Sequence, residues 1–297
     1  MCFWGTTAGE DGVVDVDKDI LVADRSERGK LRFSGEQRAW FLDQILTQSF
    51  EGIQPGETRE AAMLTAHGRM TGYLEALAVE EAILCHFEPE LKETLPEAIR
   101  RYVFATRVEI EDVSDERGLV LIAGEGWREF ANKTVPVPSY HETRSLGIPA
   151  GYAWLDRDYV SDALNELEKA GARPVNDDEL EAIRIERGVP RWGKEMDTKT
   201  FPQETGIDEL AVHYEKGCYL GQEAMAKIHF RGKVNRRLVK LEADGPLKVG
   251  SDLMLDEKKV GRVTSALNGR GLALVSHTIE AGTRLEADEI RAAVVDR

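Results

Sequence analysis

The sequence predicts an α+β fold for most of the chain, followed by a C-terminal region of short strands. Up to about residue 230, strand and helix patterns alternate. The strands are joined partly by hairpin turns and partly by helices, which favours α+β over a parallel α/β sheet. From about Arg236, short apolar segments are separated by turn residues, which is typical of a small β-barrel or sandwich. We therefore expect a domain boundary between residues 1–230 and residues 231–297.

The strand predictions rest on apolar runs, alternating or continuous, that are bounded by turn residues, with Gly68 in the turn of a hairpin. Strands are expected at residues 31–33, 61–65, 70–79, 82–87, 108–110, 119–123, 238–241, 253–255, 260–263, 272–275 and 290–295. The segment that contains Pro136, Pro138 and Pro149 is predicted to be loose.

The helix predictions rest mainly on capping patterns. Ser34, with Gln37 three residues later, matches a capping box and predicts a helix that ends near residue 48. Asn176 and Glu179 predict a second capped helix that ends at Arg187. Further helices are expected at residues 88–101, where Pro96 is a point of interruption, and at 127–131 and 161–169.

Composition limits the classes of function. The chain has 297 residues, of which 42% are apolar and 31% charged, and its net charge is −15. Such an acidic surface repels phosphate backbones and argues against broad nucleic-acid binding. No apolar run approaches the roughly 18–20 residues of a membrane span, and residues 1–20 lack the pattern of a secretory or transit peptide. We therefore expect a cytoplasmic protein without membrane contact, and we expect a monomer.

Three cysteines, Cys2, Cys85 and Cys218, are odd in number and far apart. A disulfide framework is therefore not expected, and no histidine lies at a metal-finger spacing from a cysteine. We expect no metal site formed by this chain alone.

The segment from Lys216 to Glu223 reads KGCYLGQE and contains the candidate catalytic residues Cys218 and Lys216. A cation two residues from a thiol stabilises the thiolate and raises its reactivity. The alternative is a structural cysteine, because a free cysteine is usually a small buried apolar residue. A carboxylate-free basic run from Lys227 to Lys240, which includes Arg231, Arg236 and Arg237, is either an anion site or a solvated face.

The motif resembles the K-G-C-[FY]-x-G-Q-E signature of the YgfZ-type folate-binding proteins, which are relatives of the T-protein (aminomethyltransferase) of the glycine cleavage system. Four further segments resemble family motifs: Arg184 to Gly188 (R-x-E-x-G), Gly193 to Glu195 (G-x-E), Pro202 to Gly206 (P-x-E-x-G) and Leu64 to Met70 (L-T-x-x-G-R-M). The resemblance covers nearly the whole chain.

This resemblance implies a folate-binding α+β region of two interlaced subdomains, with an exchange near residues 45–135, and a C-terminal β-barrel around a central folate channel. It implies tetrahydrofolate or a derivative as cofactor. The implied cofactor-binding residues are Glu186, Glu195, Tyr219, Gln222, Glu223, Arg231 and Arg237. It further implies a role in iron–sulfur protein maturation or repair, with transient iron–sulfur partners, an indirect effect on tRNA modification, and Cys218 as a thiolate or cluster ligand.

One departure from the family pattern bears on the chemistry. The T-protein carries an acidic residue just after the hairpin glycine, whereas here no carboxylate follows Gly68 until Glu75. Without that acid, aminomethyl transfer lacks its proton-handling group. We therefore expect folate binding without aminomethyltransferase activity. The alternatives are a folate-dependent aminomethyltransferase and a binding module whose cysteine is structural.

Overall fold

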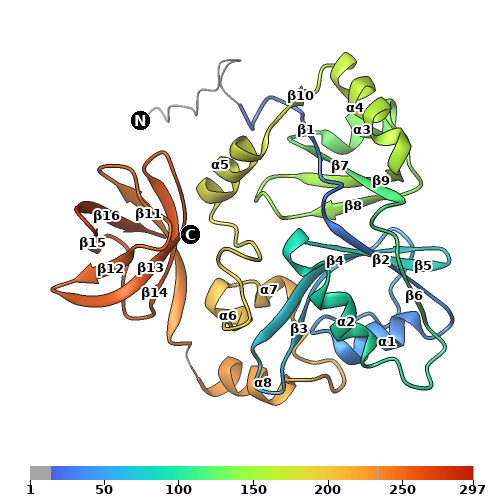
Figure 1. Cartoon of the computed structure of the whole chain (residues 1–297). Helices are drawn as coiled ribbons and strands as arrows, with labels where there is room; N and C mark the ends of the chain where they lie inside the picture. Colours follow the sequence, from blue (N-terminus) through green and yellow to red (C-terminus); the bar gives the residue numbers. More distant parts are fainter. Residues whose placement is uncertain (1–14, 233, 297) are drawn as a thin grey trace.

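A computed structural model describes residues 15–232 and 234–296, apart from the side chain of Arg231. The described chain forms two five-stranded sheets and a closed barrel, with short helices packed around the sheets (Figure 1). The predicted α+β fold with a C-terminal β-barrel is therefore confirmed.

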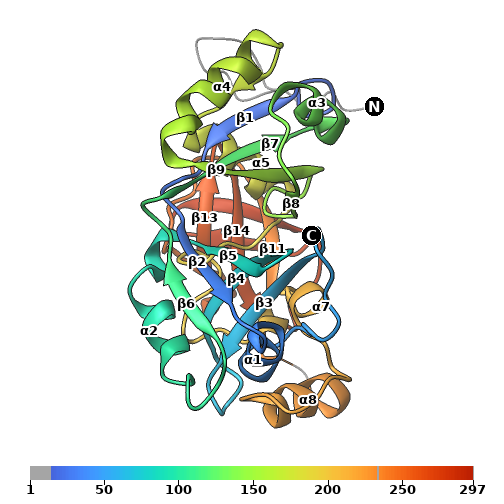
Figure 2. The same ribbon diagram turned by 90° about the vertical axis from the view of Figure 1, so that its right-hand side faces the viewer.

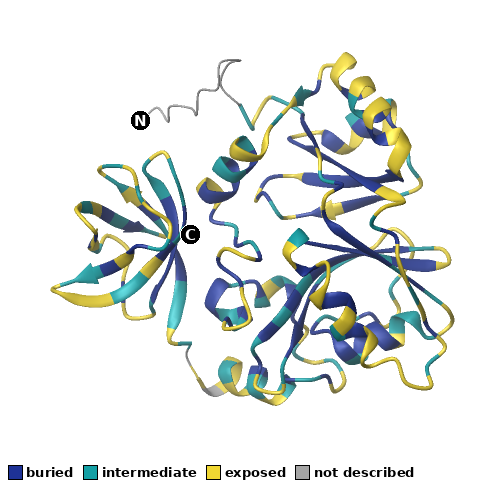
Figure 3. Cartoon of the chain, in the orientation of Figure 1, coloured by how far each residue is buried: buried dark blue, intermediate teal, exposed yellow. Residues whose placement is uncertain are grey.

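The first sheet has the order β10-β1-β7-β9-β8. Its strands are β1 (Leu21–Asp24), β7 (Arg117–Ala123), β8 (Tyr140–Thr143), β9 (Ala150–Asp156) and β10 (Arg173–Pro174). Helices α3 (Trp127–Thr134) and α4 (Val160–Lys169) pack on one face, and α5 (Asp177–Arg187) packs on the other. Figure 3 shows the strands largely buried and the outer side of α4 exposed.

The second sheet has the order β3-β4-β5-β2-β6. Its strands are β2 (Gly29–Ser34), β3 (Thr58–Leu64), β4 (Met70–Val79), β5 (Ala82–Phe87) and β6 (Glu109–Asp112). One face packs against α1 (Arg38–Ile45) and α2 (Thr94–Arg100), which follows a 3-10 turn at Pro89–Leu91. The opposite face meets the first sheet, where Leu77 packs with Tyr152 and Trp154. The chain therefore passes from the first sheet to the second after β1 and returns at β7.

The barrel has the strand order β11-β14-β13-β12-β15-β16. Its strands are β11 (Arg236–Ala243), β12 (Asp252–Leu255), β13 (Lys258–Leu267), β14 (Arg270–Ser276), β15 (Arg284–Ala287) and β16 (Ile290–Val295). Ile185 of α5 packs against Leu238, Leu272 and Leu274 on its wall. Helix α5 thus lies between the barrel and the first sheet (Figure 1).

Three short helices lead to the barrel: α6 (Pro202–Thr205), α7 (Asp208–Ala211) and α8 (Gln222–Arg231). Figures 1 and 2 both place α8 at the end of the molecule opposite α3 and α4. Among the described residues, no helix has the length and apolar character to cross a membrane.

Several element predictions need correction. Ser34 is the last residue of β2, and α1 begins at Arg38 without a side-chain cap, because the Gln37 side chain accepts a hydrogen bond from the Arg107 amide instead. The helix predicted at 88–101 is interrupted before Pro96, which sits in the first turn of α2, where proline is tolerated. The segment predicted to be loose contains β8, and β9 begins directly after Pro149.

Candidate functional site

The central cavity has a volume of about 500 Å³ and is lined by both sheets, α5 and the segment after it. This volume falls in the range of small-molecule sites. Its apolar lining includes Tyr152, Trp192, Met196, Ile207 and Leu210. The flat aromatic side chains and the aliphatic side chains of this lining can pack against the faces of a planar ring.

Carboxylates project into this cavity from β3 and β4. The antiparallel register of these strands places Glu60 directly opposite Glu75, and both side chains line the cavity. Burial raises the pKa of Glu60, which accepts a hydrogen bond from the Tyr73 hydroxyl. Burial also raises the pKa of Glu75 to about 7, although the Arg28 guanidinium opposes this shift. Such carboxyl groups can bind N–H donors of a ring or exchange a proton.

Two arginines hold one wall of the cavity together. Arg28 is buried and lies 3.3 Å from Glu75 and 2.5 Å from Glu88. Arg191 donates to the other oxygen of Glu88 at 2.8 Å. Burial disfavours the ionised form of Glu88, but the two guanidiniums outweigh this effect and hold its pKa below the usual value. This network fixes the position of Glu75.

Arg144 is an exposed cation of the cavity lining, as is Lys194. Among the described residues, its guanidinium has no hydrogen-bond or ion-pair partner. An unpaired guanidinium beside a cavity is suited to bind a ligand carboxylate in a bidentate manner.

Glu195, a predicted cofactor ligand, is only 1% exposed and lies in a hydrogen-bonded network. It accepts from Arg184 at 2.8 Å, from Ser265 at 2.6 Å and from the Arg191 amide at 3.0 Å. Arg184 also pairs with Glu181, at 2.6 Å and 2.9 Å. Because Ser265 belongs to β13, this network joins α5 to the barrel, and Glu195 has no contact with the central cavity.

The other predicted ligands from α5 and the barrel also lie outside the cavity. Glu186 is exposed and pairs with Arg270 of β14 at 3.1 Å. Arg237 donates to the carbonyl of Ile279 at 2.7 Å and 3.1 Å. The side chain of Arg231 lies outside the described part of the structure. Their predicted roles in cofactor binding stay predictions, without support from this geometry.

The Lys216–Glu223 motif occupies a loop that leads into α8, and none of its residues lines the cavity. Cys218 is exposed, as is Glu223. Gln222 donates to the Lys216 carbonyl at 3.1 Å and closes the loop. Tyr219 is buried, which raises its pKa to about 12.

The ammonium group of Lys216 makes its hydrogen bonds to main-chain carbonyls and not to the thiol of Cys218. It donates to the carbonyls of Asp43, Leu46 (2.8 Å) and Gln48 (2.9 Å), at and just beyond the C-terminal end of α1. A lysine has three N–H donors, so none remains for the thiol. The predicted activating role of Lys216 stays a prediction without support from this geometry, because its ammonium group binds the carbonyls at the end of α1.

Gly221 shows why the motif contains its second glycine. Its φ is +86°, and a Cβ there would lie 2.5 Å from the Thr65 carbonyl in the β3–β4 hairpin turn. Any other residue would push the motif loop away from the hairpin. The close contact between Gly221 and the hairpin therefore fixes the position of the loop on which Cys218 is exposed.

Several candidate site residues were not identified from the sequence: Arg28, Glu60, Arg144, His86 and His141. His86 carries a signal, since it is the one polar residue among the apolar residues of β5, whereas Glu60 follows two other polar residues at the partly buried start of β3. Their register with Glu75 across the sheet follows from the hairpins. His141 has no such signal, because β8 joins the group from the other sheet.

Comparisons with known proteins agree with this architecture. Residues 235–296 match the family model described as CAF17, C-terminal beta-barrel domain. A chloroplastic protein of Arabidopsis thaliana, named as a transferase, is 27% identical over 90% of this chain and 68% of its own length. An aminomethyltransferase of Thermotoga neapolitana is 26% identical over 92% of this chain and 83% of its own length.

A solved structure establishes the fold. The glycine cleavage system aminomethyltransferase T of Bartonella henselae superimposes with a TM-score of 0.84 at 16% identity, over 95% of this chain and 86% of that one. The chain thus has the fold of that enzyme, with a C-terminal barrel that matches the CAF17 domain. The cytoplasmic location and the monomeric state of this chain stay predictions.

Proposed function

We propose that this chain is a tetrahydrofolate-binding accessory protein that acts in the maturation or repair of iron–sulfur proteins, with an indirect effect on tRNA modification. The observation that carries the folate part is the central cavity, which combines apolar ring surfaces, buried carboxyl groups and the unpaired Arg144. In this proposal, residues 1–230 form the folate-binding region, with an exchange near residues 45–135, and residues 231–297 form the barrel.

The cavity offers groups of suitable chemistry for the ring system and for the glutamate tail of a folate molecule. The pterin ring presents adjacent N–H donors, and the carboxyl group of Glu60 offers two acceptors. Trp192 and Tyr152 provide aromatic surfaces for the ring system. The glutamate tail carries carboxylates, which Arg144 can bind. We therefore assign pterin recognition to Glu60 rather than to Glu186, which is paired with Arg270 outside the cavity.

Replacing Glu60 with glutamine is expected to weaken the binding of 5-formyltetrahydrofolate, measured by titration calorimetry, by about 10- to 100-fold. The amide presents one acceptor and one donor, so one pterin N–H meets a donor. The matched control is Glu186→Gln, on the exposed face of α5, which should bind as wild type does. Loss of binding in Glu186→Gln with retention in Glu60→Gln would reverse the assignment, and no binding by wild type would refute folate binding.

The iron–sulfur role rests on the motif loop. Cys218 is exposed in the loop that leads into α8, and this loop is separate from the cavity and open to a partner protein. A Cys218→Ser variant should fail to restore the activity of an iron–sulfur enzyme in cells that lack this protein. It should still bind folate as wild type does. Full restoration by Cys218→Ser would refute the thiol role and favour the reading of a structural cysteine.

The alternative of aminomethyl transfer is supported by one observation. Glu75 lies in the cavity wall, where a carboxyl group can act near bound folate. Formation of methylenetetrahydrofolate from an aminomethyl donor, lost in Glu75→Gln, would establish this activity. Folate binding without formation of methylenetetrahydrofolate would contradict this activity and favour the accessory role.

A further inference from the structure

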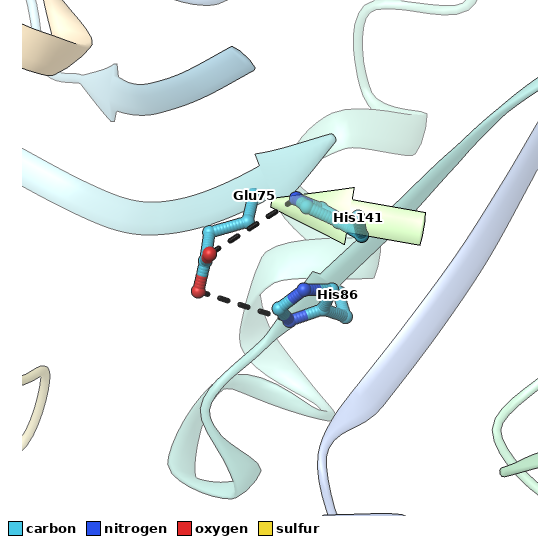
Figure 4. A group of neighbouring side chains, drawn as sticks. All are labelled: Glu75, His86 and His141. Carbon is cyan, nitrogen blue, oxygen red and sulfur yellow. Dashed lines mark ion pairs between the residues drawn. The ribbon is translucent and has the colours of Figure 1, made fainter. Parts of the chain in front are cut away.

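A group of three buried side chains lies where the two sheets meet, directly behind the cavity wall. Glu75 comes from β4, His86 from β5 and His141 from β8, and Figure 4 shows the three side chains pointing toward one another. Glu75 and His86 are direct partners across the second sheet. Because β8 belongs to the first sheet, the group joins the two sheets.

The imidazole nitrogens of this group lack partners. His86 and His141 are 0% exposed, and within the described chain neither ring nitrogen of either histidine has a hydrogen-bond partner. Each buried polar group without a partner costs about 1–3 kcal/mol, and folded proteins rarely leave several together. Burial lowers the pKa of both histidines, that of His141 to about 3, so both rings are neutral. Neutral imidazoles are the form that binds metal ions.

We propose that Glu75, His86 and His141 bind a divalent first-row transition metal ion of the Zn²⁺ or Fe²⁺ type. The carboxylate oxygens of Glu75 lie 4.0 Å from His86 Nδ1 and 4.0 Å from His141 Nε2. All three ligand atoms lie within 4.8 Å of one another. Metal bonds of about 2.0–2.2 Å at tetrahedral angles place two ligand atoms about 3.3–3.6 Å apart. An inward shift of each ligand atom by up to roughly 0.7 Å completes the site.

The ligand set selects the class of metal. Two imidazoles and one carboxylate are ligands of zinc and of non-haem iron, whereas calcium and magnesium prefer oxygen ligands alone. Thr143 donates to Glu75 at 2.6 Å and orients the carboxylate toward the histidines. Because Glu75 also lines the cavity, the ion lies beside the proposed folate site.

The positive charge of Arg28 is balanced without Glu75. Its guanidinium lies 3.3 Å from Glu75 but only 2.5 Å from Glu88. When a metal ion takes the Glu75 carboxylate, Arg28 keeps its shorter ion pair with Glu88. The ion therefore need not leave a buried arginine without a partner.

The test uses the full chain, freed of metal by a chelator, unfolded, and refolded with increasing CoCl₂ so that burial does not block access. Wild type should bind one equivalent of Co²⁺, with visible d–d bands that lack a thiolate charge-transfer band. His86→Leu and His141→Leu should each weaken binding by roughly 100-fold or more. Cys218→Ser and His213→Ala, which remove exposed potential ligands, should bind as wild type does. Failure of wild type to bind, or binding by both histidine variants as tight as that of wild type, overturns the proposal.

Thermal unfolding provides a second measurement. It distinguishes a metal site from imidazole nitrogens that only lack hydrogen-bond partners. ZnCl₂ should raise the Tm of wild type, because a ligand stabilises the state that binds it, and should leave His141→Leu unchanged. Without a metal site, Zn²⁺ has no effect on wild type and His141→Leu is at least as stable, because it removes two unpaired polar atoms. That result refutes the site. Neither measurement involves folate, so their failure is distinguishable from failure of the proposed function.

Discussion

Replacing Arg184 with methionine is expected to destabilise the protein by about 3–5 kcal/mol, the largest effect of any single substitution considered. Arg184 is 3% exposed and binds Glu195, Glu181 and Ser265. Without it, Glu195 stays buried as an uncompensated charge. The loss also breaks the connection from α5 to the barrel through Ser265. Guanidinium denaturation, followed by circular dichroism and tryptophan fluorescence, measures the effect.

Two further variants isolate the cause. In the double variant Arg184→Met/Glu195→Gln the buried charge is absent, so part of the lost stability should return, and the two substitutions should be strongly non-additive. Arg187→Met is the matched control, because Arg187 is exposed on the same helix, and it should change stability by less than about 0.5 kcal/mol. Additive effects of Arg184→Met and Glu195→Gln would contradict a coupled buried pair.

The local patterns of the sequence predict the elements that are stabilised locally. The capping box of α5 is present as predicted, since the Asn176 side chain accepts from the Glu179 amide and Gly188 ends the helix with φ +73°. The hairpin strands β4 and β5 also have their predicted bounds. In each case the determining contacts lie within a few residues along the chain.

Predictions that depend on contacts between distant segments were less successful. β9 is buried along nearly its whole length, so it lacks the alternation that marks a half-buried strand, and β8 is very short. The cavity draws residues from both sheets and α5. Spacing along the chain cannot show that Glu60, Arg144 and Trp192 meet. The same limit applies to Glu195, whose cofactor role stays a prediction: its spacing along the chain does not show that the fold pairs its carboxylate with Arg184.

Lys216 illustrates this limit and leads to the second large effect. Its closeness to Cys218 along the chain predicts thiolate activation, but the folded chain brings it to the C-terminal end of α1. Lys216→Met is expected to destabilise the protein by about 2–4 kcal/mol, because buried helix carbonyls lose a charged donor. Denaturation by guanidinium, compared with wild type, measures this effect. Lys227→Met, on the exposed side of α8, is the control and should have little effect.

The pH dependence gives the same residue a second readout. Burial lowers the pKa of Lys216 to about 8 from 10.5, so between these pH values the unfolded chain binds more protons than the folded chain. The free energy of unfolding contributed by this residue therefore rises with pH from about 8 to 10.5. The stability difference between wild type and Lys216→Met should widen over that interval and stay constant below it.

Alkylation of Cys218 by iodoacetamide distinguishes the structural role of Lys216 from a role in activating the thiol. If Lys216 only holds α1, the pH midpoint of alkylation is the same in wild type and in folded Lys216→Met. A higher midpoint in a variant of undiminished stability would restore the role of Lys216 as the activating cation.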